Sequence, residues 1–384
     1  MSSHSQHESP RPGGATHEGG HPVHAIVLAA GEGTRMRSQR PKPLHRICGR
    51  PMVLHVIHAL RDVAPATTIV VVGHGADLVT AKVAVDAPGF TNTHFALQEV
   101  QNGTGHAVGI GLEALGYQSH DSIDDPSTVL VLPGDTPLLR HDTIARLVAE
   151  HQSRGHAATV LVSRMDDPTG YGRVIRAKDG RVMRIVEQRD ASPDELAVDE
   201  INTSIYAFRR DLLGPALRQV TPDNAQGEYY LTDVISVLAG MGHRIGAVEA
   251  PAAETQGVND RWQLAMAERE LRARTNRHWL LSGVTMLDPR QTFIDVDVRI
   301  GRDVTLFPGT MLQGTTVIGD SCEIGPDTRL TDCTVGHGSV VQNTVGRDAV
   351  VGDSATVGPF AFLAAGTRVA DGRNTGAFYD SSAS

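Results

Sequence analysis

Short apolar runs alternate with amphipathic helical patterns between residues 23 and 258. Four of these runs are short, rich in β-branched residues and apolar on both faces, which is typical of buried strands: H-A-I-V-L-A-A (24–30), T-T-I-V-V-V-G (67–73), S-T-V-L-V-L-P (127–133) and A-A-T-V-L-V-S (157–163). Helical patterns lie between them, as in P-M-V-L-H-V-I-H-A-L and D-T-I-A-R-L-V-A-E-H. The alternation predicts an α/β fold with a doubly wound, mostly parallel sheet covered by helices on both faces. Ligands of such sheets bind beyond the carboxyl ends of the strands, where Gly31 and Asp135 would lie.

A different pattern fills the C-terminal part of the chain. Aliphatic residues recur there every six positions, and continue after a short slip: Ile300, Leu306, Leu312, Ile318, Ile324 and Leu330, then Val335, Val341, Val351, Val357, Leu363 and Val369. A six-residue period fits neither a helix nor a simple sheet, and it predicts a parallel β-helix in which each repeat supplies one strand and one corner. Three repeats make one turn, so we expect about four coils. A solenoid this short has exposed ends and would gain stability by associating with copies of itself.

These patterns divide the chain into four segments. Residues 1–22 lack an apolar core and predict a disordered tail, and their histidines have no folded scaffold that would fix them as metal ligands. The α/β domain spans 23–258, a single connecting helix falls within 259–283, and the β-helix spans 284–384.

Composition narrows the class of function. The net charge of −9 argues against general nucleic-acid binding, although a few local cations can still bind a phosphorylated substrate. The three cysteines are too few and too scattered for a disulfide framework or a zinc site, and they suit a reducing cytoplasm. The chain has no apolar run long enough to cross a membrane.

The stretch A-I-V-L-A-A-G-E-G-T-R-M-R-S-Q-R-P-K-P-L (25–44) carries candidate chemistry. It is not a dinucleotide-binding fingerprint, because the third glycine of that motif would fall at Met36. It is not a P-loop either, because no G-K-[ST] follows at the required spacing. What remains is a glycine turn that lets backbone approach a ligand, followed by Arg35 and Lys42, which could neutralise a triphosphate.

The same stretch resembles the signature of the bacterial N-acetylglucosamine-1-phosphate uridyltransferases. The resemblance continues in family order through further motifs: Q-N-G-T-G-H-A (101–107), P-G-D-T-P-L (133–138), G-Y-G-R-V (170–174), I-V-E-Q-R-D (185–190), E-I-N-T-S-I (200–205), N-A-Q-G-E-Y-Y-L-T-D (224–233) and G-V-N-D (257–260). It implies a nucleotidyltransferase domain followed by a left-handed β-helix. The implied reaction is Mg²⁺-dependent transfer of a uridylyl group from UTP to N-acetylglucosamine 1-phosphate, which releases pyrophosphate.

The resemblance also implies roles for individual residues. Arg35 and Lys42 would hold phosphates, while Asp135 and Asn259 would bind Mg²⁺. The nucleotide would be held by the loops after two strands: Leu28, Ala29, Ala30, Gly31, Gln98, Gly103 and Thr104. The sugar would be held by a third group: Gly172, Glu187, Asn202, Thr203 and Asn259. Ser204 replaces a glycine common in the family, and His45 and His106 are expected to be packing or supporting groups.

Family members usually carry a longer β-helix that also acetylates glucosamine 1-phosphate. Ala364 and Ser382 stand where the resemblance places a substrate-binding arginine and lysine, and the sequence ends before the family's general base and acetyl-CoA site. We therefore expect no acetyl transfer, and a β-helix that supports a homotrimer.

Two alternatives stay open. One keeps the enzyme class with a different substrate pair, namely UTP or dTTP with glucose 1-phosphate or glucosamine 1-phosphate. The other is a non-catalytic nucleotide-sugar-binding scaffold. The combination of Arg35, Lys42, Asp135 and Asn259 favours an enzyme, because a binder needs neither leaving-group cations nor metal ligands.

Overall fold

The computed structural model describes residues 21–119 and 126–382. The expected tail therefore lies almost wholly outside the described residues. The chain divides into two compact units, of which the first comprises residues up to Leu44 together with Val53–Gly257, and the second comprises His45–Met52 together with Val258 onward. Each unit is described by itself below.

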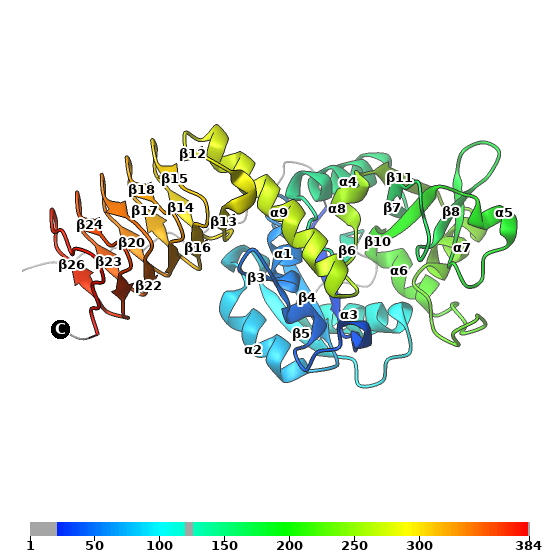
Figure 1. Ribbon diagram of the computed structural model, residues 1–384. Coiled ribbons are helices and arrows are strands. Elements are labelled where there is room, and N and C mark those ends of the chain that lie inside the picture. The colour runs from blue at the N-terminus through cyan, green and yellow to red at the C-terminus, as the bar shows by residue number, and fades with distance from the viewer. Residues whose placement is uncertain (1–20, 120–125, 383–384) are drawn as a thin grey trace, which may run out of the picture. The chain divides into compact units, whose positions relative to one another are not determined.

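The first unit is built on a mixed sheet whose main strands follow the order β11-β7-β10-β6-β1-β4-β5 (Figure 1). The four runs expected to be buried strands form β1 (Val23–Ala29), β4 (Thr67–Val72), β6 (Thr128–Pro133) and β7 (Ala158–Arg164). Five more strands complete it: β5 (Thr93–Leu97), β8 (Arg173–Arg176), β9 (Val182–Val186), β10 (Glu200–Arg209) and β11 (Ile245–Glu249). Parallel pairing joins β1 to β4 and β6, β4 to β5, and β7 to β11. The expected mostly parallel sheet is confirmed.

Within the main strand order, one central strand runs against the others. The strand β10 pairs antiparallel with both β6 and β7, and its register shifts between Asn202 and Tyr206. Ser204 lies in this shift with a φ of 61°, in the left-handed region that favours glycine. Hydrophobic patterning could not reveal the reversal, because a buried strand has the same composition in either direction.

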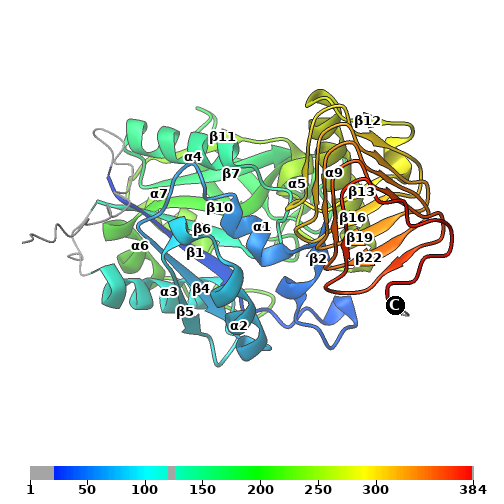
Figure 2. The ribbon, with the colours of Figure 1, turned by 90° about the vertical axis from the view of Figure 1, so that its left-hand side faces the viewer.

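Helices cover both faces of this sheet, as Figures 1 and 2 show for α4 on one side and α3 and α6 on the other. One core contains side chains of α1 (Met52–His58), α2 (Ala76–Asp86) and α4 (His141–Arg154). The opposite core contains side chains of α3 (Thr104–Ser119), α6 (Arg210–Leu217) and α7 (Asp233–Gly240). Two short helices, α5 (Pro193–Leu196) and α8 (Ala252–Thr255), complete the unit.

The second unit begins with a hairpin that the sequence pattern did not predict. Strands β2 (Arg46–Ile47) and β3 (Arg50–Pro51) pair antiparallel around a tight turn. The turn is held by other parts of the second unit: the Cys48 amide donates to the Glu268 carboxylate over 2.7 Å, and the Cys48 carbonyl accepts from the Val296 amide over 3.1 Å. The chain thus enters the second unit directly after Leu44 and leaves it again at Val53.

The expected single helix is confirmed as α9 (Arg261–Leu281), which begins where the Asp260 carboxylate accepts from the Gln263 amide. Three five-stranded parallel sheets follow, and their coils are seen one behind another in Figure 2. The first sheet contains β12 (Thr285–Met286), β15 (Thr305–Leu306), β18 (Glu323–Ile324), β21 (Val340–Val341) and β24 (Thr356–Val357). The second contains β13 (Phe293–Ile294), β16 (Met311–Gln313), β19 (Arg329–Thr331), β22 (Val345–Arg347) and β25 (Phe362–Leu363). The third contains β14 (Arg299–Ile300), β17 (Val317–Ile318), β20 (Thr334–Val335), β23 (Val350–Val351) and β26 (Arg368–Val369).

This unit is the left-handed β-helix, and the six-residue period has the predicted cause. Ile300 pairs with Ile318 and Leu312 pairs with Leu330, so every third repeat returns to the same sheet with its aliphatic side chain inside the prism. The expectation of about four coils is corrected, because each sheet has five strands among the described residues. The additional coil escaped the repeat count because the inward residues Met286 and Ile294 are separated by the short helix η4 (Pro289–Gln291) rather than by six positions.

The gap in the repeat between Val341 and Val351 also has a physical explanation. Gly346 occupies the inward position there, paired with Leu330 on one side and Leu363 on the other. A Cβ at Gly346 would lie 3.0 Å from Leu330 Cδ2, so the larger neighbours already fill the space that an aliphatic side chain would need.

The cysteines Cys48, Cys322 and Cys333 are buried and form no disulfide. Among the residues that the structure describes, every helix is too short or too polar to cross a membrane.

Candidate active site

The carboxyl ends of β1 and β6 lie side by side. Leu28 pairs with Pro133, and the Gly134 amide donates to the Leu28 carbonyl over 2.8 Å. The sheet order reverses at this point, because β1 is followed along the chain by β4 on one side while β6 lies on the other. The glycine turn after β1 and Asp135 after β6 therefore meet at a topological switch point, where α/β sheets bind ligands.

An ion pair joins the two loops. The Lys42 ammonium contacts the Asp135 carboxylate, and the two side chains are 13% and 25% exposed. Lys42 begins the short helix η2 (Lys42–Leu44), whereas Arg35 lies exposed in η1 (Thr34–Met36). The structure thus brings together one of the two predicted phosphate ligands, Lys42, and one of the two predicted metal ligands, Asp135.

Two glycines of the turn have different surroundings. Gly33 has a φ of 64°, and a Cβ there would lie 2.6 Å from Lys42 Cβ, so its backbone packs directly on the lysine stem. Gly31 would meet no heavy atom within 4 Å, so its Cα faces open space. The backbone between strand and turn is held by Ala30, whose carbonyl accepts from Gln101 Nε2 over 2.8 Å. These contacts fit a turn that fixes Lys42 on one side and exposes backbone to a ligand on the other.

The residues expected to hold the base form a connected loop. Gln98 is buried, and its Nε2 donates to the Gly103 carbonyl over 3.3 Å and lies 3.1 Å from His106 Nδ1. Gly103 has a φ of 100°, and a Cβ there would lie 2.7 Å from the Tyr229 carbonyl oxygen. The Thr104 hydroxyl accepts from the Leu231 amide over 3.1 Å. Gln98, Gly103 and Thr104 are therefore brought together, with His106 as a direct support of Gln98.

Three of the expected sugar ligands also lie together. A Cβ on Gly172 would lie 3.4 Å from Glu187 Oε1, and the Asn202 amide donates to the Gly172 carbonyl over 2.9 Å. The Asn202 side chain donates to the Tyr206 hydroxyl over 2.7 Å. Thr203 differs, because its hydroxyl donates to the Leu161 carbonyl over 2.6 Å and so serves the pairing of β10 with β7.

The Glu187 carboxylate lies in a strongly acidic environment. Its pKa is raised above the ordinary value, mainly by burial and further by the negative charges of Asp190 and Asp233, while a hydrogen bond from Thr232 opposes the shift. Burial and the carboxylates of Asp190 and Glu187 also raise the pKa of Tyr230 to about 12. Burial and neighbouring carboxylates thus act in the same direction on Glu187 and Tyr230, while Arg189 opposes the shift at Tyr230. Such perturbed groups are typical of a functional position.

Three neighbours of these residues were missed by the sequence analysis. Burial and the nearby Asp135 charge raise the pKa of Tyr171, which directly precedes Gly172 in the chain. Thr232 and Tyr230 approach Glu187 from the segment before α7, and the Tyr230 hydroxyl is buried with no hydrogen-bond partner among the described residues. All three belong to quoted motifs, G-Y-G-R-V and Y-Y-L-T-D, which were the available signal.

The predicted metal ligands fall in different units. Asp135 belongs to the first unit, where a Cβ on Gly257 would lie 3.7 Å from its Oδ1. Asn259 belongs to the second unit, where its amide donates to Gln263 Oε1 over 2.7 Å. Among the described residues, no group of three or more His, Cys, Asp and Glu side chains could hold a metal ion by itself. A partly exposed carboxylate that already faces a cation fits Mg²⁺, which is usually bound through one or two protein oxygens plus substrate phosphates.

The comparisons with known proteins agree with this geometry. Residues 25–230 match the model of the MobA-like NTP transferase domain. The bifunctional protein GlmU of Thermobifida fusca is 50% identical over 332 residues, which cover 86% of this chain and 67% of that protein. The GlmU proteins of Streptomyces avermitilis and Caldanaerobacter subterraneus are 48% and 45% identical, and the matches cover 94% and 88% of this chain and 73% and 71% of those proteins.

The chain belongs to the GlmU family. It is therefore a nucleotidyltransferase, and the switch point of its first unit lies inside the matched NTP transferase domain. The resemblance noticed in the sequence motifs is confirmed over most of the chain.

Replacing Gly33 by alanine tests the contact between the glycine turn and Lys42. The added Cβ would displace Lys42, and we expect kcat/KM for nucleotidyl transfer to fall by about a hundredfold, as for a roughly 1 Å misplacement of a reacting group. Gly155→Ala is the matched control, because Gly155 has a φ of 60° but open space around its Cβ position. Both variants carry left-handed strain, so equal activities would contradict the role given to Gly33.

The raised pKa of Glu187 predicts opposite effects on stability and activity. The folded protein takes up this proton at a higher pH than the unfolded chain, so the contribution of Glu187 to stability falls as pH rises from the ordinary glutamate pKa through the raised one. We expect Glu187→Gln to unfold at a higher denaturant concentration than the wild type at pH 7.5, and the difference to vanish below about pH 4.

Activity should change in the other direction. We expect Glu187→Gln to lose roughly tenfold or more in kcat/KM for the sugar phosphate, as for removal of a hydrogen bond to a charged group. The acid limb of its pH profile should move or disappear. The exposed Glu249→Gln is the control, and a Glu187→Gln profile identical to that of the control would rule out the assigned role.

Proposed function

We propose that the protein transfers a uridylyl group from UTP to N-acetylglucosamine 1-phosphate, giving UDP-N-acetylglucosamine and pyrophosphate. The observation that carries the proposal is the Lys42–Asp135 pair at the β1–β6 switch point, flanked by the Gln98 loop and the Glu187 group. Cations, a metal-binding carboxylate and two recognition regions within one domain are what transfer of a nucleotide to a phosphorylated sugar requires.

Lys42 and Arg35 bind the triphosphate and neutralise charge that develops on the leaving pyrophosphate. A phosphate oxygen of the sugar phosphate forms the new bond to the α-phosphorus, while the bond from this phosphorus to the bridging oxygen of pyrophosphate breaks. Positioning and charge neutralisation carry such a reaction, so a covalent protein nucleophile is not required.

Asp135 and Asn259 are the residues proposed to hold Mg²⁺. The bound ion would neutralise phosphate charge and help to align the reacting oxygens. The Lys42 ammonium balances the Asp135 carboxylate, so the charges of the two loops are paired.

Recognition is divided between two loops. The Gln98 amide carries both a donor and an acceptor, which matches the edge of uracil, and the exposed backbone around Gly31 approaches the nucleotide. Glu187 accepts from sugar hydroxyls, and Asn202 supplies amide contacts. Ser204, two residues after Asn202, has a φ in the left-handed region, which is the conformation that a glycine there would adopt. Its side chain adds a hydroxyl close to the residues proposed to bind the sugar.

A pyrophosphate-release assay tests the proposal. With Mg²⁺, UTP and N-acetylglucosamine 1-phosphate we expect turnover, and we expect Lys42→Ala and Asp135→Asn each to reduce kcat by about a hundredfold or more. Lys82→Ala is the control, because Lys82 pairs with Asp86 on the surface of α2. Faster turnover with dTTP, glucose 1-phosphate or glucosamine 1-phosphate would reassign the substrate, and no pyrophosphate release from any pair would refute the proposed activity.

The β-helix is proposed to assemble the protein rather than to transfer acetyl groups. Ala364 and Ser382 stand where a substrate-binding arginine and lysine were expected, and neither side chain carries a positive charge. The Ala364 amide donates to Ser381 Oγ, and the Ser382 hydroxyl donates to Asp380. Apolar side chains point outward instead: Val345 and Phe362 pair across β22 and β25 while 50% and 44% exposed. The outward apolar side chains support a homotrimer, and the proposed cytoplasmic location rests on membership of the GlmU family.

The two roles predict separate results. We expect no acetylation of glucosamine 1-phosphate by labelled acetyl-CoA under conditions that support uridylyl transfer, and a trimer in sedimentation velocity. Acetylated product would overturn the first expectation, and a monomer at micromolar concentration would overturn the second.

A further inference from the structure

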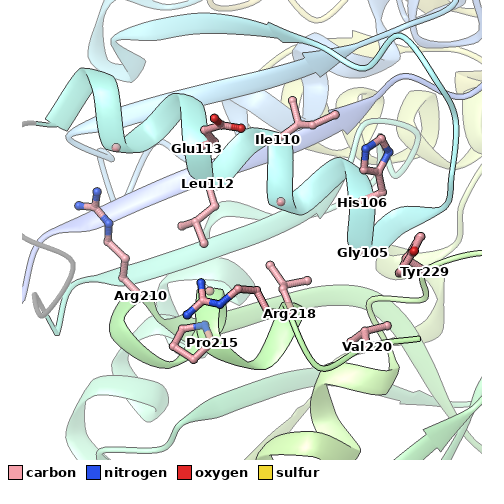
Figure 3. Close-up of a pocket in the computed structure, with 14 residues that line it drawn as sticks. Gly105, His106, Ile110, Leu112, Glu113, Arg210, Pro215, Arg218, Val220 and Tyr229 are labelled. Atoms are coloured by element: carbon pink, nitrogen blue, oxygen red, sulfur yellow. The ribbon is translucent and has the colours of Figure 1, made fainter. Parts of the chain in front are cut away.

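A cavity of about 670 Å³ lies in the first unit between α3 and α6 (Figure 3). Its volume falls within the usual range for small-molecule sites. The cavity follows α3 from His106 to Gly116. The residues proposed for catalysis do not line it, so it is a separate feature of the domain.

Glycines keep this space open. A glycine inside a helix lowers helix stability and normally needs a packing reason. Gly111 has one, because a Cβ there would lie 2.6 Å from Ile26 Cγ2 in the core. Gly109 and Gly116 line the cavity, and a Cβ on either would meet no heavy atom within 4 Å among the described residues. Packing does not require these two glycines, and any larger side chain would occupy the cavity.

The lining is largely apolar and holds a few charged groups. Ile110 and Leu112 line it from α3, and Pro215 and Val220 line it from α6 and the segment after it (Figure 3). Its charged side chains are Arg218, Glu113 and Arg210, of which Arg210 is buried and engaged in an interaction of its own. Arg218 extends between the two walls in Figure 3 and is exposed, which leaves it able to contact a ligand.

We propose that this cavity binds a small amphipathic anion, with its apolar part between α3 and α6 and its anionic group at Arg218. Apolar walls with a few placed polar groups are the usual composition of small-molecule sites. The exposed Arg218 guanidinium favours an anionic group over a neutral or cationic one at this place.

One end of the cavity is lined by residues that adjoin the loop of Gln98, Gly103 and Thr104, which is proposed to hold the base. His106 lines the cavity and supports Gln98, and Gly105 lines it while its amide donates to the Tyr229 carbonyl over 2.7 Å. A ligand that contacts this end changes the freedom of the loop that holds the base, so ligand and nucleotide alter each other's affinity by the same factor. This coupling rests on the proposed function, whereas binding to the cavity does not.

Titration with 8-anilinonaphthalene-1-sulfonate, an aromatic sulfonate that fluoresces in apolar sites, tests the cavity. We expect one saturable site in the wild type, at least tenfold weaker binding in Gly109→Leu, and roughly fivefold weaker binding in Arg218→Gln. Arg154→Gln on α4, which covers the opposite face of the sheet, should bind as the wild type does. Unchanged binding in both cavity variants would place the dye elsewhere, for instance on the exposed Phe360 and Phe378, and would overturn the proposal.

The coupling is tested by repeating the titration with saturating UTP and Mg²⁺, with UTP binding measured independently by calorimetry. We expect the dissociation constant of the dye to change by about fivefold. An unchanged constant with UTP bound would overturn the coupling. Failure of UTP to bind would refute the proposed function and the coupling with it, while the variant titration would still decide the cavity site.

Discussion

The parallel pairing of β1 with both β4 and β6 is the constraint on which the candidate site depends. It fixes the carboxyl ends of β1 and β6 at one edge of the sheet. The hydrogen bond from the Gly134 amide to the Leu28 carbonyl then fixes where the loop after β6 begins. Because these strands are buried on both faces, a shift of register would disrupt the packing on both faces and move Asp135 away from Lys42. The packing of the core therefore holds the side chains of these loops in position.

Charge is distributed unevenly over the two recognition regions. In the region proposed to bind phosphates, Lys42 and Asp135 form an ion pair. In the region proposed to bind the sugar, burial and two neighbouring carboxylates raise the pKa of Glu187, which costs stability at neutral pH. A ligand with phosphates at one end and hydroxyls at the other suits both regions. Its phosphates can pair with the Lys42 ammonium, and its hydroxyls can donate to the Glu187 carboxylate.

Much of this arrangement could be predicted from the sequence, for identifiable reasons. Buried strands such as T-T-I-V-V-V have an unambiguous composition, and the aliphatic residue at every sixth position follows directly from three repeats per coil. Motif order suggested Lys42, Asp135, Gln98 and Glu187 as site residues, and their roles are proposals. The reversed direction of β10 could not be predicted, because composition carries no direction. The first coil of the β-helix was missed because η4 interrupts the spacing. The hydrogen bond from Thr203 to the Leu161 carbonyl was not predicted, because backbone acceptors cannot be read from side-chain patterns.

The hairpin from His45 to Met52 has a consequence for how this chain can be divided. Three residues after Lys42 the backbone leaves the first unit, forms β2 and β3 against Glu268 and Val296, and returns to the first unit as α1. The units are thus joined by three covalent crossings rather than by one linker. A fragment cut after Gly257 would keep the hairpin but lose its partners, which would expose Cys48 and leave the turn without Glu268 and Val296, a few residues after Lys42. Independent inheritance or exchange of the nucleotidyltransferase domain would need a substitute for those partners.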